Sequence, residues 1–178
     1  MTFESWDFYR GMSKKYPSDK PFVKEVRQDR LPRDSSKNFH EAADAWFNKR
    51  FGIKYRSQSV FVTSRKLTAQ TYALASSQST EDSVVRVVRV LPLTAYTYCW
   101  SPEVSDLRFK AKEMADAEWS AIHEYLDTAG YCGEGLAQAH ELGHEVMVNC
   151  GSYIAVPIGL LQVSASSGNS NIILLSGA

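Results

Sequence analysis

Apolar and polar positions along the chain follow two periods, and each period predicts a different kind of element. Phe3, Trp6, Tyr9 and Met12 recur at helical spacing, so an amphipathic helix is expected over residues 3–15. Other runs are rich in apolar and β-branched residues, which favour strands. The strands predicted from these runs cover 22–27, 59–63 and 84–91.

Helical patterns and one further strand unit account for most of the remaining sequence. The first predicted helix is capped by Asp34 or Ser35 and ended by Gly52. The others cover 65–74, 136–141 and 103–127, the last being one long helix or a helical pair. Residues 145–156 read as a strand, a turn and a second strand. Polar or Ser/Gly-rich composition predicts loops at 76–82 and 164–171.

Length and composition indicate a single globular domain over residues 1–178, with one well-buried core. No apolar run approaches the roughly 18 residues that a membrane span requires, so no membrane partner is expected. The opening Met1–Asp7 is acidic and aromatic, unlike a secretory signal. Cys99, Cys132 and Cys150 form no CxxC pair, which favours a reducing compartment such as the cytoplasm.

The formal net charge of zero conceals a basic and an acidic part of the chain. Residues 1–70 carry 15 Lys and Arg against 8 Asp and Glu, giving +7, and the remainder carries 5 against 12, giving −7. A basic half suits ligands that bear phosphate, although the same charges also fit a solvated helix surface. A nucleic-acid-binding module is therefore one alternative, but no docking motif for nucleic acid is recognisable.

A second alternative comes from residues 140–144, which spell the HExxH zinc signature. In that motif His140 and His144 bind the metal on one helical face, and Glu141 acts as general base. A catalytic zinc needs a third protein ligand, yet residues 146–178 contain no His, Asp or Glu. We therefore predict no metal site and keep a zinc metalloprotease as an alternative.

Three segments carry short motifs in a fixed order. An Arg, any residue and Asp lie within Val26–Asp34, a hydroxyl pair ends the strand Val60–Ser64, and a glutamate heads the strand unit Glu145–Val156. Together these segments resemble the mono-ADP-ribosyltransferase superfamily, in its arginine, serine/threonine, glutamate class, to which the catalytic chains of cholera and pertussis toxins belong.

This resemblance implies a fold and an activity. The expected fold is α+β, a split β-sandwich of two small antiparallel sheets with a nucleotide cleft between them, flanking helices, and a core of about 22–160. The helical segment 103–142 would be inserted before a final hairpin. The implied activity is transfer of ADP-ribose from NAD, the cofactor that serves as substrate, to RNA, DNA or protein. The implied setting is a toxin of a conflict system, such as a toxin–antitoxin or antiphage module, with an inhibitory antitoxin protein as partner.

The resemblance also assigns roles to individual residues. Glu145 would hydrogen-bond the ribose 2′-hydroxyl of NAD and stabilise positive charge on the ribose as nicotinamide leaves. Arg27 would grip the pyrophosphate, with Arg30 as a competitor for that role. Either Thr63 or Ser64 would supply the hydroxyl that holds these groups in place.

Two positions near these residues bear on the bound ligand and the acceptor. Tyr72 is a candidate to stack on nicotinamide, although such aromatic residues more often serve packing. Gly143 stands two residues before Glu145, where arginine-modifying members of the superfamily carry Glu, so arginine is a doubtful acceptor. Water as the acceptor would make the protein an NAD glycohydrolase, a further alternative.

Overall fold

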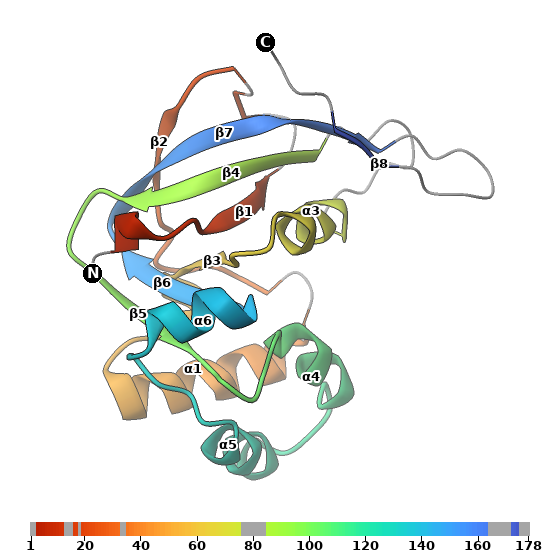
Figure 1. Cartoon of the computed structure of the whole chain (residues 1–178). Coiled ribbons are helices and arrows are strands. Elements are labelled where there is room, and N and C mark those ends of the chain that lie inside the picture. The colour runs from red at the N-terminus through yellow and green to blue at the C-terminus, as the bar shows by residue number, and fades with distance from the viewer. Residues whose placement is uncertain are drawn as a thin grey trace.

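Two antiparallel sheets form the centre of the computed structural model, which describes residues 3–12, 16–17, 19–32, 35–75, 85–163 and 172–174. The first sheet has the order β1, β4, β7, β2, formed by Tyr9–Met12, Val85–Pro92, Ser152–Val163 and Phe22–Glu25. The second has the order β3, β6, β5, formed by Val60–Val62, Val146–Cys150 and Tyr96–Trp100. The two sheets lie one above the other in Figure 1. They meet where Tyr9 and Thr63 exchange two backbone hydrogen bonds.

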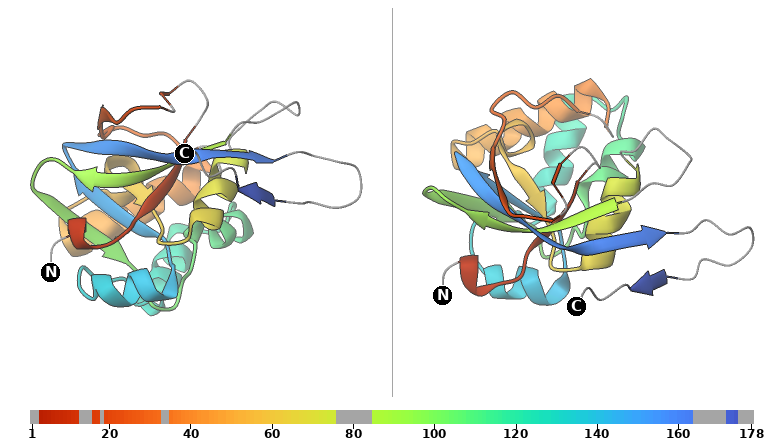
Figure 2. Two further views of the ribbon diagram at one scale, coloured as in Figure 1. Left: turned by 45° about the horizontal axis from the view of Figure 1, so that its top comes forward. Right: turned by 90° about the horizontal axis from the view of Figure 1, so that it is seen from above.

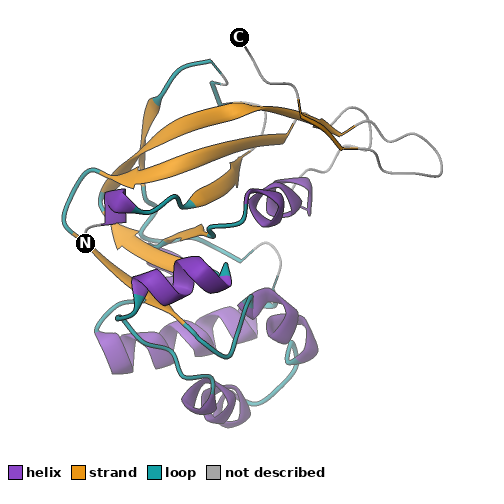
Figure 3. Cartoon of the chain, viewed as in Figure 1, coloured by secondary structure: helices purple, strands orange, loops and turns teal. Residues whose placement is uncertain are grey.

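Six α-helices and one 3₁₀ turn, η1 (Phe3–Ser5), complete the described part of the chain. The α-helices are α1 (Lys37–Phe51), α2 (Tyr55–Gln58), α3 (Lys66–Ala75), α4 (Leu107–Glu113), α5 (Trp119–Thr128) and α6 (Leu136–Leu142). Figure 3 shows that most of the helices gather on the side of the second sheet. The last strand, β8 (Ile172–Leu174), pairs with the far end of β7, outside the body formed by the sheets and helices (Figure 2).

The strands β3 and β6 are buried on both faces, because they separate two hydrophobic cores. Val60 and Val62 pack into a core shared with the first sheet, whereas Phe61 packs with α1 and α5 in the other core. Successive side chains of a strand point to opposite faces, so a strand between two cores is apolar at every position. This explains the continuous apolar runs from which these strands were predicted.

The helix predicted over residues 3–15 is wrong. Only Phe3–Ser5 forms a short 3₁₀ turn, and Tyr9–Met12 is strand β1, which pairs with β4 over the full range Arg86–Arg89. Tertiary pairing overrides the helical spacing, because a four-residue segment gains more from sheet hydrogen bonds than from an isolated helical turn. Gly11 allows helix α3 to pack closely against β1, because a Cβ atom at this position would lie 2.1 Å from the carbonyl oxygen of Ala69 on α3.

The prediction that residues 145–156 form a hairpin is also wrong. Strands β6 and β7 follow one another directly, yet β6 pairs with β3 and β5 in the second sheet, while β7 pairs with β4 and β2 in the first. Both edges of β6 are already occupied, so β7 has no edge on which to pair. The chain changes sheets at Gly151 instead.

The other predicted helices and strands are found, but several ends differ: α1 begins at Lys37, α4 begins at Leu107, and β7 extends to Val163. Helix α2 and strand β8 were absent from the prediction. The segment 103–127 is a helical pair, α4 and α5, and it precedes β6 with α6 as expected. Strand β5 was not predicted. The loops expected at 76–82 and 164–171 lie outside the described residues. The overall class, a mixed α+β fold with two antiparallel sheets, is confirmed. Among the described residues, no helix combines the length and apolar character needed to cross a membrane.

Candidate functional site

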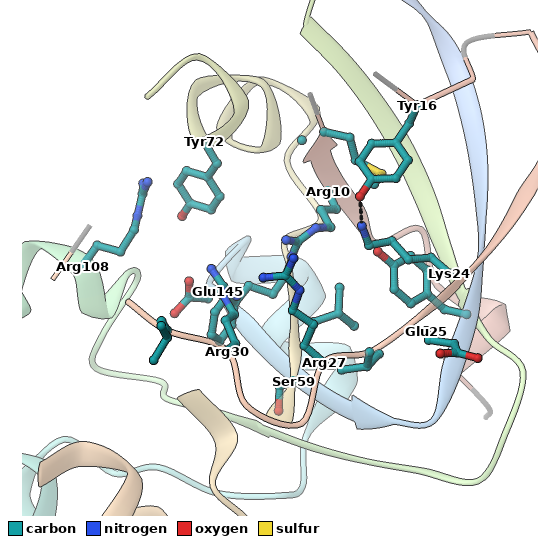
Figure 4. Close-up of a pocket in the computed structure, with 17 residues that line it drawn as sticks. Arg10, Tyr16, Lys24, Glu25, Arg27, Arg30, Ser59, Tyr72, Arg108 and Glu145 are labelled. Atoms are coloured by element: carbon teal, nitrogen blue, oxygen red, sulfur yellow. Dashed lines mark hydrogen bonds between the residues drawn. The ribbon is translucent and has the colours of Figure 1, made fainter. Parts of the chain in front are cut away.

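A pocket of about 230 Å³ opens between the two sheets (Figure 4). Its walls come from β1, from the end of β2 and the segment after it, from β3, and from single residues of other elements. The lining residues are Arg10, Gly11, Met12, Tyr16, Lys24, Glu25, Val26, Arg27, Arg30, Leu31, Ser59, Val60, Phe61, Tyr72, Arg108, Glu145 and Tyr153. Five of these carry positive charge and two carry carboxylates, so the pocket favours an anionic ligand.

Glu145 lies in the wall of this pocket, directly before β6. Its backbone N–H donates to the Ser105 carbonyl oxygen at 2.9 Å, which fixes the start of the strand, and its side chain is only 6% exposed. Burial raises the pKa of the Glu145 carboxyl, the Arg56 guanidinium opposes that rise, and Asp106 adds to it. The predicted catalytic carboxylate therefore occupies the kind of desolvated position in which a charge acts most strongly.

Arg56 is the partner of Glu145, and sequence patterns did not single it out. Its Nη1 lies 3.6 Å from Glu145 Oε1, and the side chains are 7% and 6% exposed. The arginine is placed by α2, where Asp44 of α1 accepts a hydrogen bond from the Arg56 backbone N–H at 2.8 Å. Its guanidinium lies 4.8 Å from the centroid of the Phe61 ring. No local signal distinguished it, because α1 and α2 converge on β6 only in the folded chain.

Three arginines direct their guanidinium groups into the middle of the pocket in Figure 4: Arg10, Arg27 and Arg30. Arg27 and Arg30 both line the pocket, so the geometry does not choose between them. Arg27 is exposed and lies two residues beyond β2, whereas Arg30 packs 4.2 Å from the Phe61 ring centroid. Arg10 was missed because its segment was read as a helix. From β1 its Nη1 donates to the Phe61 carbonyl oxygen at 3.2 Å.

Thr63 and Ser64 both bond to the segment that leads to Glu145, and neither lines the pocket. The Thr63 Oγ1 donates to the Gly143 carbonyl oxygen at 2.8 Å, and the Ser64 Oγ donates to the His140 carbonyl oxygen. The register pairs Val62 of β3 with the residue directly after Glu145. The two hydroxyls therefore fix the backbone before Glu145.

Tyr72 lines the pocket from α3, next to Arg108 of α4. The Arg108 guanidinium carbon lies 3.8 Å from the Tyr72 ring centroid, and Asp106 accepts hydrogen bonds from Arg108 Nε at 3.0 Å and Nη2 at 2.8 Å. Burial raises the pKa of the Tyr72 hydroxyl strongly, and the negative charges of Glu145 and Asp106 raise it further. A hydrogen bond from the phenol to Asp106 contributes to this rise, so the hydroxyl stays protonated.

The HExxH residues do not share a helical face. Helix α6 ends at Leu142, and Gly143 follows in the left-handed conformation with φ of 75°. His140 packs against the rings of Trp6 and Phe8, and His144 Nδ1 lies 2.9 Å from the Ser101 carbonyl oxygen. The described residues contain no cluster of three His, Cys, Asp or Glu side chains suited to a metal.

Comparisons of the chain with protein-family models, with curated proteins and with solved structures found no match. The function is therefore argued from the geometry of the pocket.

Proposed function

We propose that this protein is an ADP-ribosyltransferase that takes ADP-ribose from NAD and transfers it to a macromolecule. The observation that carries the proposal is one buried carboxylate, Glu145, in the wall of a pocket that is otherwise rich in arginine. Such a pocket suits a ligand that is mostly anionic but develops positive charge at one atom beside the carboxylate. NAD meets this description, because its pyrophosphate is anionic and its ribose gains positive charge as nicotinamide leaves.

The chain's own residues supply the binding and the electrostatics. Arg10, Arg27 and Arg30 would hold the pyrophosphate, since guanidinium groups bind phosphate oxygens in a planar, bidentate way. Glu145 would accept a hydrogen bond from the ribose 2′-hydroxyl and stabilise the developing charge at C1′. Tyr72 would stack beside the ribose.

The Thr63 and Ser64 hydroxyls support this chemistry although neither residue lines the pocket. Thr63 and Ser64 bond the carbonyls of Gly143 and His140, so they hold the backbone that aims Glu145. Such positioning matters because a fixed charge costs no reorganisation when the bond breaks. We therefore propose a positioning role for both, with Thr63 acting closer to Glu145.

The proposal is tested by comparing the wild type with Glu145→Gln and with a matched control, Glu141→Gln. Glu141 is exposed on α6, four residues away in sequence. Nicotinamide release from labelled NAD and transfer of label to a cell lysate are both measured. Loss of the Glu145 charge is expected to lower both rates by about 10²- to 10³-fold, the usual effect of removing one electrostatic stabiliser. The control should retain the wild-type rates.

The outcomes separate the alternatives. Unchanged label transfer in Glu145→Gln refutes the proposal. Nicotinamide release without label on any macromolecule identifies an NAD glycohydrolase. A nucleic-acid-binding module would show salt-dependent binding that survives Glu145→Gln and would leave NAD intact.

A further inference from the structure

A second, smaller pocket also has Glu145 in its wall. Four residues line both pockets, namely Arg30, Phe61, Arg108 and Glu145, and the smaller one is completed by Pro32, Ser35, His40 and Arg56. Its volume is about 20 Å³, too small for a nucleobase or an aromatic side chain but sufficient for the oxygens of a small group. A group held there is adjacent to the same carboxylate as a ligand in the larger pocket.

The charges around the second pocket favour an anion. The Arg56 side chain is 7% exposed, and its Nε and Nη1 atoms form no hydrogen bond with any described residue. Among the described residues its only ion-pair partner is Glu145, whose Oε1 lies 3.6 Å from Arg56 Nη1. Buried guanidinium N–H groups without acceptors are costly, so this side chain is suited to an oxygen-rich anion that supplies them.

Two neighbouring features strengthen this preference. Arg30 lies over the same Phe61 ring as Arg56, with centroid distances of 4.2 and 4.8 Å, and both arginines line the second pocket. The N-terminal turn of α1 borders the pocket through Ser35 and His40, and the positive end of a helix dipole favours anions. Burial lowers the pKa of His40, and its Nε2 lies 3.1 Å from Ser57 Oγ, so the ring borders the pocket while already bonded within the protein.

Apart from Glu145 itself, the carboxylates of described residues beside the second pocket are already paired, so none of them is free to deprotonate a weak nucleophile. Gly143, two residues before Glu145, has φ of +75°, and a Cβ atom there would lie 2.4 Å from Arg65 Nε, so no acidic side chain fits. Asp106 is held by Arg108, and Asp44 accepts from Ser57 and from the Arg56 backbone. A nucleophile that arrives already ionised needs no base.

We propose that the second pocket binds the terminal phosphate monoester of a nucleic-acid strand, and that a phosphate oxygen is the acceptor of ADP-ribose. This inference rests on the proposed function. An oxygen lone pair forms the O–C1′ bond, the C1′–N bond breaks, and its electron pair neutralises the nicotinamide ring. No proton is transferred and nothing is oxidised or reduced. A nucleic-acid strand is preferred over a phosphopeptide because the basic residues 1–70, with net charge +7, suit a polyanion.

The test uses the wild-type protein, labelled NAD and one oligonucleotide with either a 5′-phosphate or a 5′-hydroxyl, as RNA and as DNA. We expect labelling of the phosphorylated strand to exceed that of the hydroxyl strand by at least about tenfold, and the labelled end to resist phosphatase. Equal labelling of both strands, or labelling of a phosphopeptide alone, overturns the inference. Nicotinamide release is followed in parallel, so NAD cleavage without strand labelling refutes the acceptor while leaving the proposed NAD chemistry intact.

A second measurement locates the phosphate in the small pocket. Inorganic phosphate should inhibit transfer competitively against the oligonucleotide and not against NAD. Competition with NAD would instead place the pyrophosphate on these arginines and overturn the assignment. Arg56→Gln should lower the ratio of strand transfer to nicotinamide release by about fivefold, equivalent to roughly 1 kcal/mol. An exposed control, Arg50→Gln, should leave that ratio unchanged.

Discussion

At the scale of single residues, the pair of Glu145 and Arg56 controls the electrostatics of the site. A buried carboxylate without a partner would take up a proton near neutral pH, and the arginine at 3.6 Å favours the ionised form. The proposed catalysis through a negatively charged Glu145 therefore requires both groups. Neither residue alone defines the site.

This coupling predicts a pH dependence. Burial raises the pKa of Glu145 above the ordinary value of 4.5, so the acid limb of nicotinamide release in the wild type should lie above pH 4.5. Activity is present above the raised pKa and is lost as the pH falls through it. Arg56→Gln removes the opposing cation and should move this limb to higher pH.

The measurement is the pH profile of nicotinamide release at saturating NAD. Arg56→Lys serves as the conservative variant and should restore much of the wild-type profile, because it keeps the charge. An acid limb that stays in place in Arg56→Gln would show that the arginine does not set the ionisation of Glu145.

At the scale of elements, the site depends on close packing between β1 and α3. Strand β1 carries Arg10 and helix α3 carries Tyr72, and both line the larger pocket. The helix approaches so closely at Gly11 that an added Cβ atom would lie 2.1 Å from the Ala69 carbonyl oxygen and 2.6 Å from Ala73 Cβ. The glycine thus sets the distance between two walls of the pocket.

Gly11→Ala should therefore destabilise the protein and weaken ligand binding together. Overpacking against a backbone atom is expected to lower the free energy of unfolding by about 1–3 kcal/mol, because strand and helix must separate. Urea denaturation measures this loss. Gly133→Ala is the control, since its nearest neighbour, the Tyr98 carbonyl oxygen, lies 3.3 Å from the added atom. Equal stability of the two variants would contradict the packing argument.

At the scale of the whole molecule, the larger pocket lies where the two sheets converge. Residues of the first sheet, such as Arg10 and Tyr153, face residues of the second layer, such as Phe61 and Glu145. A ligand that contacts both layers binds only when they are correctly placed. Binding should then stabilise the folded molecule as a unit.

ADP-ribose, the portion of NAD without nicotinamide, should raise the melting temperature of the wild type. At a hundredfold excess over its Kd, the gain in unfolding free energy is about 2.7 kcal/mol. The double variant Arg27→Gln, Arg30→Gln should lose most of this gain, because it removes two pyrophosphate contacts, whereas Arg50→Gln should keep it. Thermal unfolding followed by circular dichroism provides the measurement, and an equal shift in all three proteins would exclude these arginines from the site.

Local patterns were sufficient for most elements and for part of the site. The strands at 22–27, 59–63 and 84–91 were recognisable because each is a short run of apolar and β-branched residues, and Glu145 stood out as a charge at the head of such a run. Arg10 was hidden by the misread helix at 3–15. Arg56 was hidden because α2 has only four residues and no distinctive pattern.

The sequence by itself determined the positions of most helices and strands and the helical segment before β6, since these follow from the periodicity of neighbouring residues. The two antiparallel sheets and the candidates Glu145, Arg27, Arg30, Thr63, Ser64 and Tyr72 were expected from the resemblance of short, ordered motifs to a known superfamily. Only the tertiary structure decided that β6 and β7 belong to different sheets and that Arg10, Arg56 and Arg108 join the site. It also decided that Thr63 and Ser64 hold the backbone before Glu145 and do not line the pocket. The physical reason is that strand partners, ion pairs and pocket walls are contacts between distant segments, and local periodicity carries no record of which segments will meet.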